Sequence, residues 1–205
     1  HPDGMDLWGK RVPFEKMTER IATFIDGDIN FCNLETVITD RNDLPTTEKE
    51  YNFRTHPNAV KLLLKVGFNL MSIANNHVAD YGAGGIEETR KWLKKLGRKG
   101  RLHFAGAGEN IDTAATPAIF EVKGVRIAFA AVSIGVQATS KRAGVVSTHK
   151  PDAALEALKK AKADIRILSM HGGKERQLVP VGYQKSLARR AVKDFGVDIV
   201  IGHHP

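Results

Sequence analysis

Short apolar runs that end in polar or ionisable side chains are the most regular feature of this chain. Four such runs, rich in Ile, Val, Leu or Phe, occupy residues 29–35, 69–77, 164–171 and 197–204. Their length and composition predict buried β-strands. Because ligands of open α/β sheets bind beyond the carboxyl ends of the strands, the four polar endings predict one shared site.

Helical patterns alternate with these strands. Apolar residues recur at helical spacing in several segments, and Gly67 is well placed to end one of the helices. The expected helices are 13–25, 57–66, 85–96, 151–162 and 183–195. The expected strands are 29–32, 69–74, 165–170 and 197–201. This alternation predicts the α/β class.

Three further segments have patterns of their own. Residues 118–131 alternate around Lys123-Gly124, which predicts a β-hairpin. Residues 37–50 are polar and contain a proline, so we expect a loop there. Residues 105–108, Ala-Gly-Ala-Gly, resemble a phosphate-binding turn, and a tight turn is the simpler interpretation.

Length and composition favour one domain over 1–205, because 42% hydrophobic content in 205 residues supports one sizeable core and no repeat or linker interrupts the chain. No apolar stretch approaches the roughly 20 residues that span a bilayer, and residues 1–30 have no signal-peptide pattern.

The single cysteine, Cys32, lies in an apolar run, so we expect a small buried hydrophobic residue rather than a reactive thiol.

The formal net charge of +8 favours anionic partners. The positive charge is densest in residues 91–101, KWLKKLGRKGR, where a solvated helix face is the alternative interpretation. Aromatic residues are not interleaved with the basic ones as binding to single-stranded nucleic acid favours, so no nucleic-acid partner is expected.

The polar endings of the four runs supply the donors that hydrolytic metal centres use, namely imidazole, carboxylate and amide oxygen. Two metal ions about 3.5–4 Å apart clamp a phosphoryl group and activate water in many such centres. The metal-ligand candidates at the strand ends are Glu35, Asn76, His171, His203 and His204. Adjacent side chains point in different directions, so we expect one of His203 and His204 to be a ligand more strongly than both.

Three other residues are candidates for catalysis or substrate binding. His77, beside Asn76, is placed either to act as a general acid or to stabilise a developing oxyanion. Asp80 is expected either to orient His77 or to cap a turn. Arg54 is expected either to hold an anionic substrate or to form a surface salt bridge.

Six segments of the chain together resemble the bacterial capsule-synthesis family typified by the poly-γ-glutamate biosynthesis protein CapA. They are residues 33–36, 53–57, 74–77 with 80–82, 105–108, 171–175 and 202–205. They occur in the order of that family and cover almost the whole chain from about residue 12. Several segments are weak individually, whereas the ordered set is specific.

This resemblance implies a metallophosphoesterase-like layered sandwich of mixed β-sheets flanked by helices, with two divalent metal ions of Mn, Zn or Fe. It gives Glu35 a bridging-ligand role with Asn33 beside it, and it gives His77 the role of catalytic histidine. It places Asn76, His171 and His203 among the remaining ligands. Together with the strand ends, it nominates as metal ligands Asn33, Glu35, Asn76, His171, His203 and His204.

The chain departs from the family pattern in two places. The family normally begins with a strand ending in Gly-Asp, whose aspartate binds metal, and we expect no such strand in residues 1–12. The family usually has a further histidine after Gly-His-His-Pro, where this sequence reaches Pro205. We therefore expect a domain that lacks pieces at both ends and has low metal occupancy.

Two functions follow as alternatives. The first is capsule or poly-γ-glutamate biosynthesis or export with a metal-dependent, phosphoesterase-like hydrolase site. The second is a non-enzymatic accessory protein that binds the polymer and retains a vestigial metal site. The expected partners are an anionic polymer or a phosphorylated substrate, with membrane proteins of capsule synthesis, and the expected location is extracytoplasmic or at the cell surface.

Overall fold

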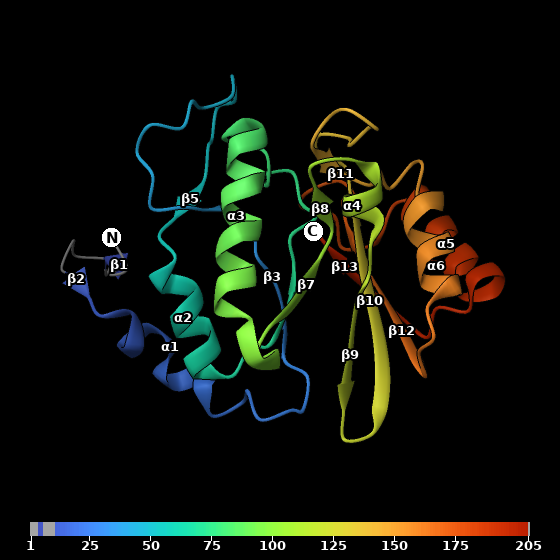
Figure 1. Ribbon diagram of the computed structural model, residues 1–205, viewed down its shortest axis with the longest axis horizontal. Helices are drawn as coiled ribbons and strands as arrows, with labels where there is room; N and C mark the ends of the chain where they lie inside the picture. Colours follow the sequence, from blue (N-terminus) through green and yellow to red (C-terminus); the bar gives the residue numbers. More distant parts are fainter. Residues whose placement is uncertain (1–3, 6–10, 205) are drawn as a thin grey trace.

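A computed structural model of the chain describes residues 4–5 and 11–204, and it is drawn in Figure 1. The helices are α1 (Phe14–Ala22), α2 (Asn58–Val66), α3 (Gly82–Leu96), α4 (Ile111–Ala115), α5 (Asp152–Lys160) and α6 (Gly182–Phe195), with a 3₁₀ turn η1 (Arg98–Gly100). The strands are β1 (Gly4–Met5), β2 (Arg11–Val12), β3 (Phe31–Asn33), β4 (Val37–Ile38), β5 (Arg54–Thr55), β6 (Leu70–Ser72), β7 (His103–Ala105), β8 (Ala107–Gly108), β9 (Ala118–Val122), β10 (Val125–Ser133), β11 (Gly144–Val145), β12 (Ile165–His171) and β13 (Ile199–His203).

Two sheets form the centre of the molecule. The larger has the order β13-β12-β10-β9, in which β10, β12 and β13 are parallel and β9 is the antiparallel partner of β10 in a hairpin. The smaller has the order β3-β6-β7 and is parallel throughout. Short two-stranded pairs, β1-β2, β4-β5 and β8-β11, lie outside these sheets. The larger sheet is therefore mixed in direction, and the smaller one is parallel.

Helices cover the central strands on both sides. In Figure 1, α1, α2 and α3 lie on one side of the strands, and α5 and α6 lie on the other. Strand β10 joins the two hydrophobic cores because its side chains alternate between them. Phe129 packs in the cluster that contains Met71 of β6, whereas Ala128 and Ala130 pack in the cluster that contains Leu155 of α5. The expected layered α/β fold of mixed sheets flanked by helices is confirmed.

Most of the predicted elements are present, with boundaries that differ by a few residues. The hairpin turns at Lys123-Gly124, and Gly67 ends α2 with φ of 119°. The loop predicted for residues 37–50 is wrong at its start, because Val37 and Ile38 form the buried strand β4. A strand of two residues is too short to show a periodic pattern in the sequence. It is recognisable only from its parallel pairing with β5.

The Ala-Gly-Ala-Gly segment serves packing between the sheets. Gly106 has φ of 121°, and a Cβ there would lie 2.6 Å from the Cβ of Ala74 and 2.9 Å from the Cβ of Ala131. Glycine is required where the backbone has positive φ and approaches a neighbour this closely. Ala105 ends β7 and Ala107–Gly108 form β8, so the segment is a bend at Gly106 between two strands instead of the expected tight turn.

The expectations about the two ends of the sequence and about membrane-spanning segments have different outcomes. The expected absence of a metal-binding strand in residues 1–12 falls largely on residues 1–3 and 6–10, which lie outside the described residues, as does Pro205. Among the helices of the described part, none is long and apolar enough to cross a membrane. The single domain over 1–205 stays a prediction.

Candidate functional site

The polar ends of four strands meet at one edge of the two central sheets. Within the larger sheet, His171 at the end of β12 is the register partner of His203 at the end of β13. Asn33 ends β3 of the smaller sheet, and its Nδ2 lies 3.3 Å from Nδ1 of His171. The carboxyl ends of both sheets therefore contribute to the same place, as the sequence pattern predicts.

A group of potential metal ligands surrounds His171. One ligand atom each from Glu35, His171 and His204 lies within 4.8 Å of the others. Nε2 of His171 is 2.7 Å from Oδ1 of Asn76 and 3.4 Å from Oε1 of Glu35. Ligand atoms that share a metal at about 2.0–2.2 Å lie roughly 2.8–3.1 Å apart in octahedral geometry and roughly 3.3–3.6 Å apart in tetrahedral geometry. The spacing around His171 is thus close to that of a coordination sphere.

The protonation state of His171 suits this arrangement. Its side chain is fully buried, and its pKa falls from 6.5 to about 3 because burial disfavours the charged ring, with smaller contributions from His204, His203 and His77. Burial also lowers the pKa of His203. Metal ions bind the neutral imidazole, so His171 is in the binding form over the whole neutral range.

Two buried polar atoms of the cluster have no partner among the described residues. They are Oδ1 of Asn33 and Nε2 of His203. Buried polar atoms are nearly always hydrogen-bonded, and Asn33, whose Nδ2 is 2.9 Å from Oε2 of Glu35 and 3.3 Å from Nδ1 of His171, has its unpartnered oxygen beside candidate ligands, which fits a site for a metal ion or its water. The donor set, with imidazole, carboxylate and amide oxygen, fits a divalent ion of the kind expected from the sequence.

The two adjacent histidines have different positions. The ring of His203 packs near Phe31 with centroids 5.3 Å apart, whereas the ring of His204 lies 4.9 Å from that of His171. The left-handed backbone of His204, with φ of 70°, accompanies this placement, and its Nε2 is 3.4 Å from Oε1 of Glu175. The family resemblance named His203 as a ligand, while the geometry places His204 in the cluster with Glu35.

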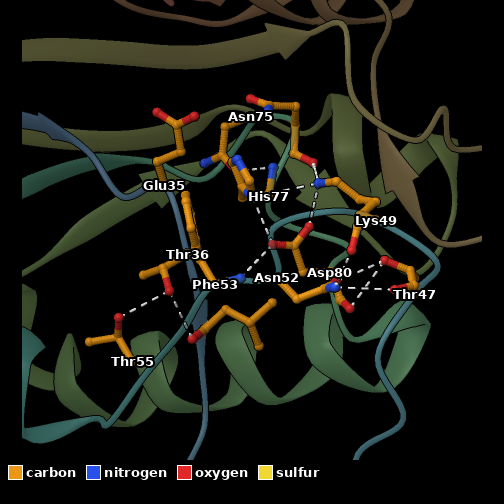
Figure 2. A network of polar contacts seen from close by, with 12 residues as sticks. Glu35, Thr36, Thr47, Lys49, Asn52, Phe53, Thr55, Asn75, His77 and Asp80 are labelled. Atoms are coloured by element: carbon orange, nitrogen blue, oxygen red, sulfur yellow. Dashed lines mark hydrogen bonds and ion pairs between the residues drawn. The ribbon is translucent and has the colours of Figure 1, made fainter. Parts of the chain in front are cut away.

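A second group lies beside the first and is shown in Figure 2. Nδ1 of His77 is 2.7 Å from Oδ2 of Asp80, and Asp80 is fully buried. The same Oδ2 accepts a hydrogen bond of 2.7 Å from the backbone N–H of Phe53, whose ring stacks on His77 at 4.0 Å. Lys49 completes the group, with Nζ 2.5 Å from Oδ1 of Asp80 and 2.9 Å from the carbonyl oxygen of Asn76. Asp80 therefore orients His77.

Asn75 connects the two groups. Its side-chain oxygen accepts from the backbone N–H of His77 at 3.0 Å, and its amide donates to the carbonyl of Leu34 at 2.9 Å. Leu34 directly precedes Glu35, so this fully buried asparagine fixes the loop that carries His77 against the loop that carries Glu35. Gly135 lies close behind, where a Cβ would approach the carbonyl oxygen of Asn75 to 2.5 Å.

Arg54 lies in β5 and makes contacts of a different kind. Its Nη1 donates to the carbonyl of Arg41 at 2.8 Å, and its guanidinium lies over the ring of Tyr81 at 5.7 Å. These contacts involve none of the candidate metal ligands. A role for Arg54 in holding an anionic substrate stays a prediction.

Comparison with known proteins identifies the family. A family model described as "Bacterial capsule synthesis protein PGA_cap" matches residues 3–205. The chain belongs to this capsule synthesis family. It is similar to "PGA biosynthesis protein CapA" of Bacillus subtilis (strain 168), with 34% identity over 98% of this chain and 54% of the relative. It is also similar to "Capsule biosynthesis protein CapA" of Bacillus anthracis, with 33% identity over 82% of this chain and 42% of the relative.

Two further matches extend the comparison. A "Probable polyglutamine synthesis accessory protein" of Mycobacterium tuberculosis is 30% identical over 97% of this chain and 54% of the relative. The chain thus spans about half the length of the curated relatives it matches. A solved structure, that of a hypothetical protein from Thermus thermophilus, has a TM-score of 0.53 at 16% identity, over 93% of this chain and 62% of that one. At this level of identity the last match shows the fold alone.

Sequence reasoning missed three residues that build the site. Lys49 lies in a polar stretch with no pattern that separates it from the other lysines. Asn75 and Phe53 belong to segments that carry the resemblance to the capsule family, so the resemblance could have indicated that these two residues contribute to the site. Their contacts depend on loops far apart in the sequence, which no local spacing reveals.

Proposed function

We propose that this chain supplies a metal-dependent, phosphoesterase-like hydrolytic site to poly-γ-glutamate capsule biosynthesis or export. The observation that carries the proposal is the placement of Asn76 Oδ1 and Glu35 Oε1 at 2.7 and 3.4 Å from Nε2 of His171, with His204 in the same cluster. The names of the Bacillus relatives support the capsule context.

The residues that would hold the metal come from both central sheets. Glu35, Asn76, His171 and His204 would provide the main ligands, with Asn33 and His203 beside them. The chemistry that Mn, Zn or Fe ions supply in such sites is Lewis-acid stabilisation of a phosphoryl oxygen and a lowered pKa for a bound water.

His77 would act on the leaving group. Its Nδ1 faces the buried carboxylate of Asp80, which fixes the orientation of the ring. Nε2 is then the nitrogen from which a proton passes to the departing oxygen. Phe53, stacked on one face of the ring, restricts its rotation and excludes water from that face.

The decisive experiment measures metal binding and turnover on the same samples. Mn²⁺, Zn²⁺ and Fe²⁺ are titrated by calorimetry, and hydrolysis of a chromogenic phosphodiester is followed in each metal. We expect His171→Ala to lose metal binding and turnover, and His77→Ala to lose turnover while keeping the metal. His149→Ala is the matched control, because this exposed histidine packs near Tyr183 and is not among the candidate ligands. Metal binding without turnover in the unmodified protein would reject the hydrolase.

A second candidate function is a non-enzymatic accessory that binds the acidic polymer and keeps the cluster as a structural remnant. The observation that favours it is a groove lined by basic residues along α3. The name of the mycobacterial relative, an accessory protein, points the same way. Full polymer binding by a protein that neither binds metal nor hydrolyses the diester supports this candidate over the first.

The location of action follows from the same context. We propose an extracytoplasmic or cell-surface role in contact with membrane proteins of capsule synthesis, because a capsule accumulates outside the cell. Fractionation of source cells, with the chain detected by antibody, tests this directly. Recovery in the cytoplasmic fraction alone would reject it.

A further inference from the structure

The basic segment at the end of α3 lines a groove outside the candidate metal site. The groove has a volume of about 740 Å³ and lies between one face of α3 and the loops that carry Glu109 and Lys141. Its charged lining consists of Arg90, Lys91, Lys94, Lys95, Arg98 and Lys141, with Glu87 and Glu109. Six cations against two carboxylates give this groove a strong positive potential.

The helical repeat explains why so many cations share the groove. Residues three, four and seven positions apart lie on one face of a helix, and Glu87, Lys91 and Lys94 of α3 follow this spacing. Arg98 follows in η1, directly after the end of α3. The two lysines of the last turn also interact favourably with the helix dipole, which accounts for part of the pattern. The dipole does not account for Lys141, which approaches from a separate loop.

Several of these cations have no internal partner. In the described part of the chain, the side chains of Lys94, Arg98 and Lys141 make no hydrogen bond or ion pair. Lys91, in contrast, pairs with Glu88 at 2.8 Å, and Lys95 lies over the ring of Trp92 at 4.5 Å. The unpaired cations are therefore free to bind an external anion.

We propose that this groove binds an acidic, γ-linked polyglutamate chain along the axis of α3. The proposal rests on the capsule role proposed above and assigns the polymer to a surface distinct from the histidine cluster. Arg90 anchors the wall of the groove by donating to the carbonyl of Ala107, while Lys94, Arg98 and Lys141 hold the carboxylates.

The spacing of charges supports a polycarboxylate as the occupant. Cations on successive turns of a helix recur about every 5.4 Å along the axis. An ordinary extended polypeptide has three backbone bonds per residue and advances at most about 3.3–3.6 Å per residue. A γ-linked glutamate has five backbone bonds per residue, so the carboxylates of successive residues lie about 5–6 Å apart along the extended chain. Because five is an odd number of bonds, successive carboxylates of an extended chain lie on opposite sides. Those on one side therefore recur about every 10–12 Å, which is close to two turns of the helix.

The lining of the groove disfavours nucleic acid. Single-stranded nucleic acids bind through aromatic side chains on which bases stack, in addition to basic ones. The residues that line this groove include no aromatic side chain, and Trp92 on the same helix is covered by Lys95. A chain of carboxylates needs cations alone.

The test compares two variants with the same change in charge. Lys94→Glu/Arg98→Glu/Lys141→Glu reverses the groove, and Lys160→Glu/Lys162→Glu/Lys193→Glu reverses three exposed lysines on and beside α5 and α6. Binding to fluorescent poly-γ-glutamate is measured by anisotropy at low and high NaCl. We expect the groove variant to bind at least about tenfold more weakly than the unmodified protein, and the control variant to bind nearly as well.

Three results would overturn the proposal. These are an equal loss in both variants, absence of polymer binding by the unmodified protein, and tighter binding to single-stranded DNA or to anionic lipid vesicles than to the polymer. The hydrolase is tested separately, because His171→Ala should retain polymer binding while it loses turnover. Circular dichroism of both variants shows whether each is folded, and the substituted positions are exposed.

Discussion

Nδ1 of His77 and Oδ2 of Asp80 are 2.7 Å apart in a buried environment, so a direct hydrogen bond to the carboxylate fixes the orientation of the imidazole. Asp80→Asn replaces the charge by an amide and weakens the orientation of the ring. We expect turnover of the phosphodiester to fall about 10- to 100-fold with metal affinity unchanged. Because both residues act through one proton transfer, His77→Ala/Asp80→Asn should be no slower than His77→Ala alone. Additive losses in this pair of variants would contradict the arrangement.

Lys49 places a positive charge in direct contact with Asp80, with 36% of the lysine side chain exposed. Lys49→Met removes the ion pair and leaves the fully buried carboxylate with its hydrogen bonds from His77 and Phe53. Because the lysine is partly solvated, we expect a loss of about 1–2 kcal/mol in the free energy of unfolding, measured with urea. Lys150→Met, at an exposed position, should change it by less than about 0.5 kcal/mol. Equal effects would show that the pair contributes nothing.

The choice between the two adjacent histidines is open to a direct comparison. His204 lies in the cluster with Glu35 and His171, whereas His203 packs near Phe31. We expect His204→Ala to weaken the binding of Mn²⁺ or Zn²⁺ by at least about tenfold, and His203→Ala to weaken it less. Isothermal titration calorimetry of both variants measures the difference. If His203→Ala loses more metal affinity than His204→Ala, His203 is the ligand, as the family resemblance implies.

Gly106 allows the two central sheets to approach each other. In Gly106→Ala the new Cβ would lie 2.6 Å from the Cβ of Ala74, at a residue with φ of 121°. We expect the free energy of unfolding to fall by about 2–4 kcal/mol from overpacking and backbone strain together. Gly124→Ala is the matched control, since Gly124 also has positive φ and has open space around it. That control should lose about 1 kcal/mol in the same denaturant titration.

Local patterns were sufficient to predict the fold class and the edge of the sheets where the site lies. The runs that end at His171 and His203 are buried strands, and parallel pairing necessarily brings their ends together. Several short strands escaped prediction, among them β4, β5, β7, β8 and β11. Val37–Ile38 is too brief to show alternation, and the three residues of His103–Ala105 are recognisable as a strand only through their parallel pairing with β6.

The inner details of the site depend on contacts that sequence spacing does not encode. Lys49 reaches Asp80 across 31 residues, and Asn33 meets His171 across 138 residues. Both His203 and His204 were predicted as candidate ligands, and the positions of their rings beside His171 accompany a left-handed backbone at His204 that no pattern indicated. Residue types at strand ends therefore predicted the composition of the cluster, whereas tertiary packing determined which atoms face one another.

Cys32 allows a test of the core that is independent of the metal. It lies in β3 between Phe31 and Asn33, and burial raises the pKa of its thiol to about 12. Because the thiolate is the reactive form, far fewer molecules are reactive at pH 8 than for a free cysteine with a pKa of about 8.5. We expect slow reaction with Ellman's reagent in the native protein and rapid reaction in guanidinium chloride. As the only cysteine of the chain, Cys32 gives an unambiguous signal, and fast native labelling would show that β3 is more open than the structure has it.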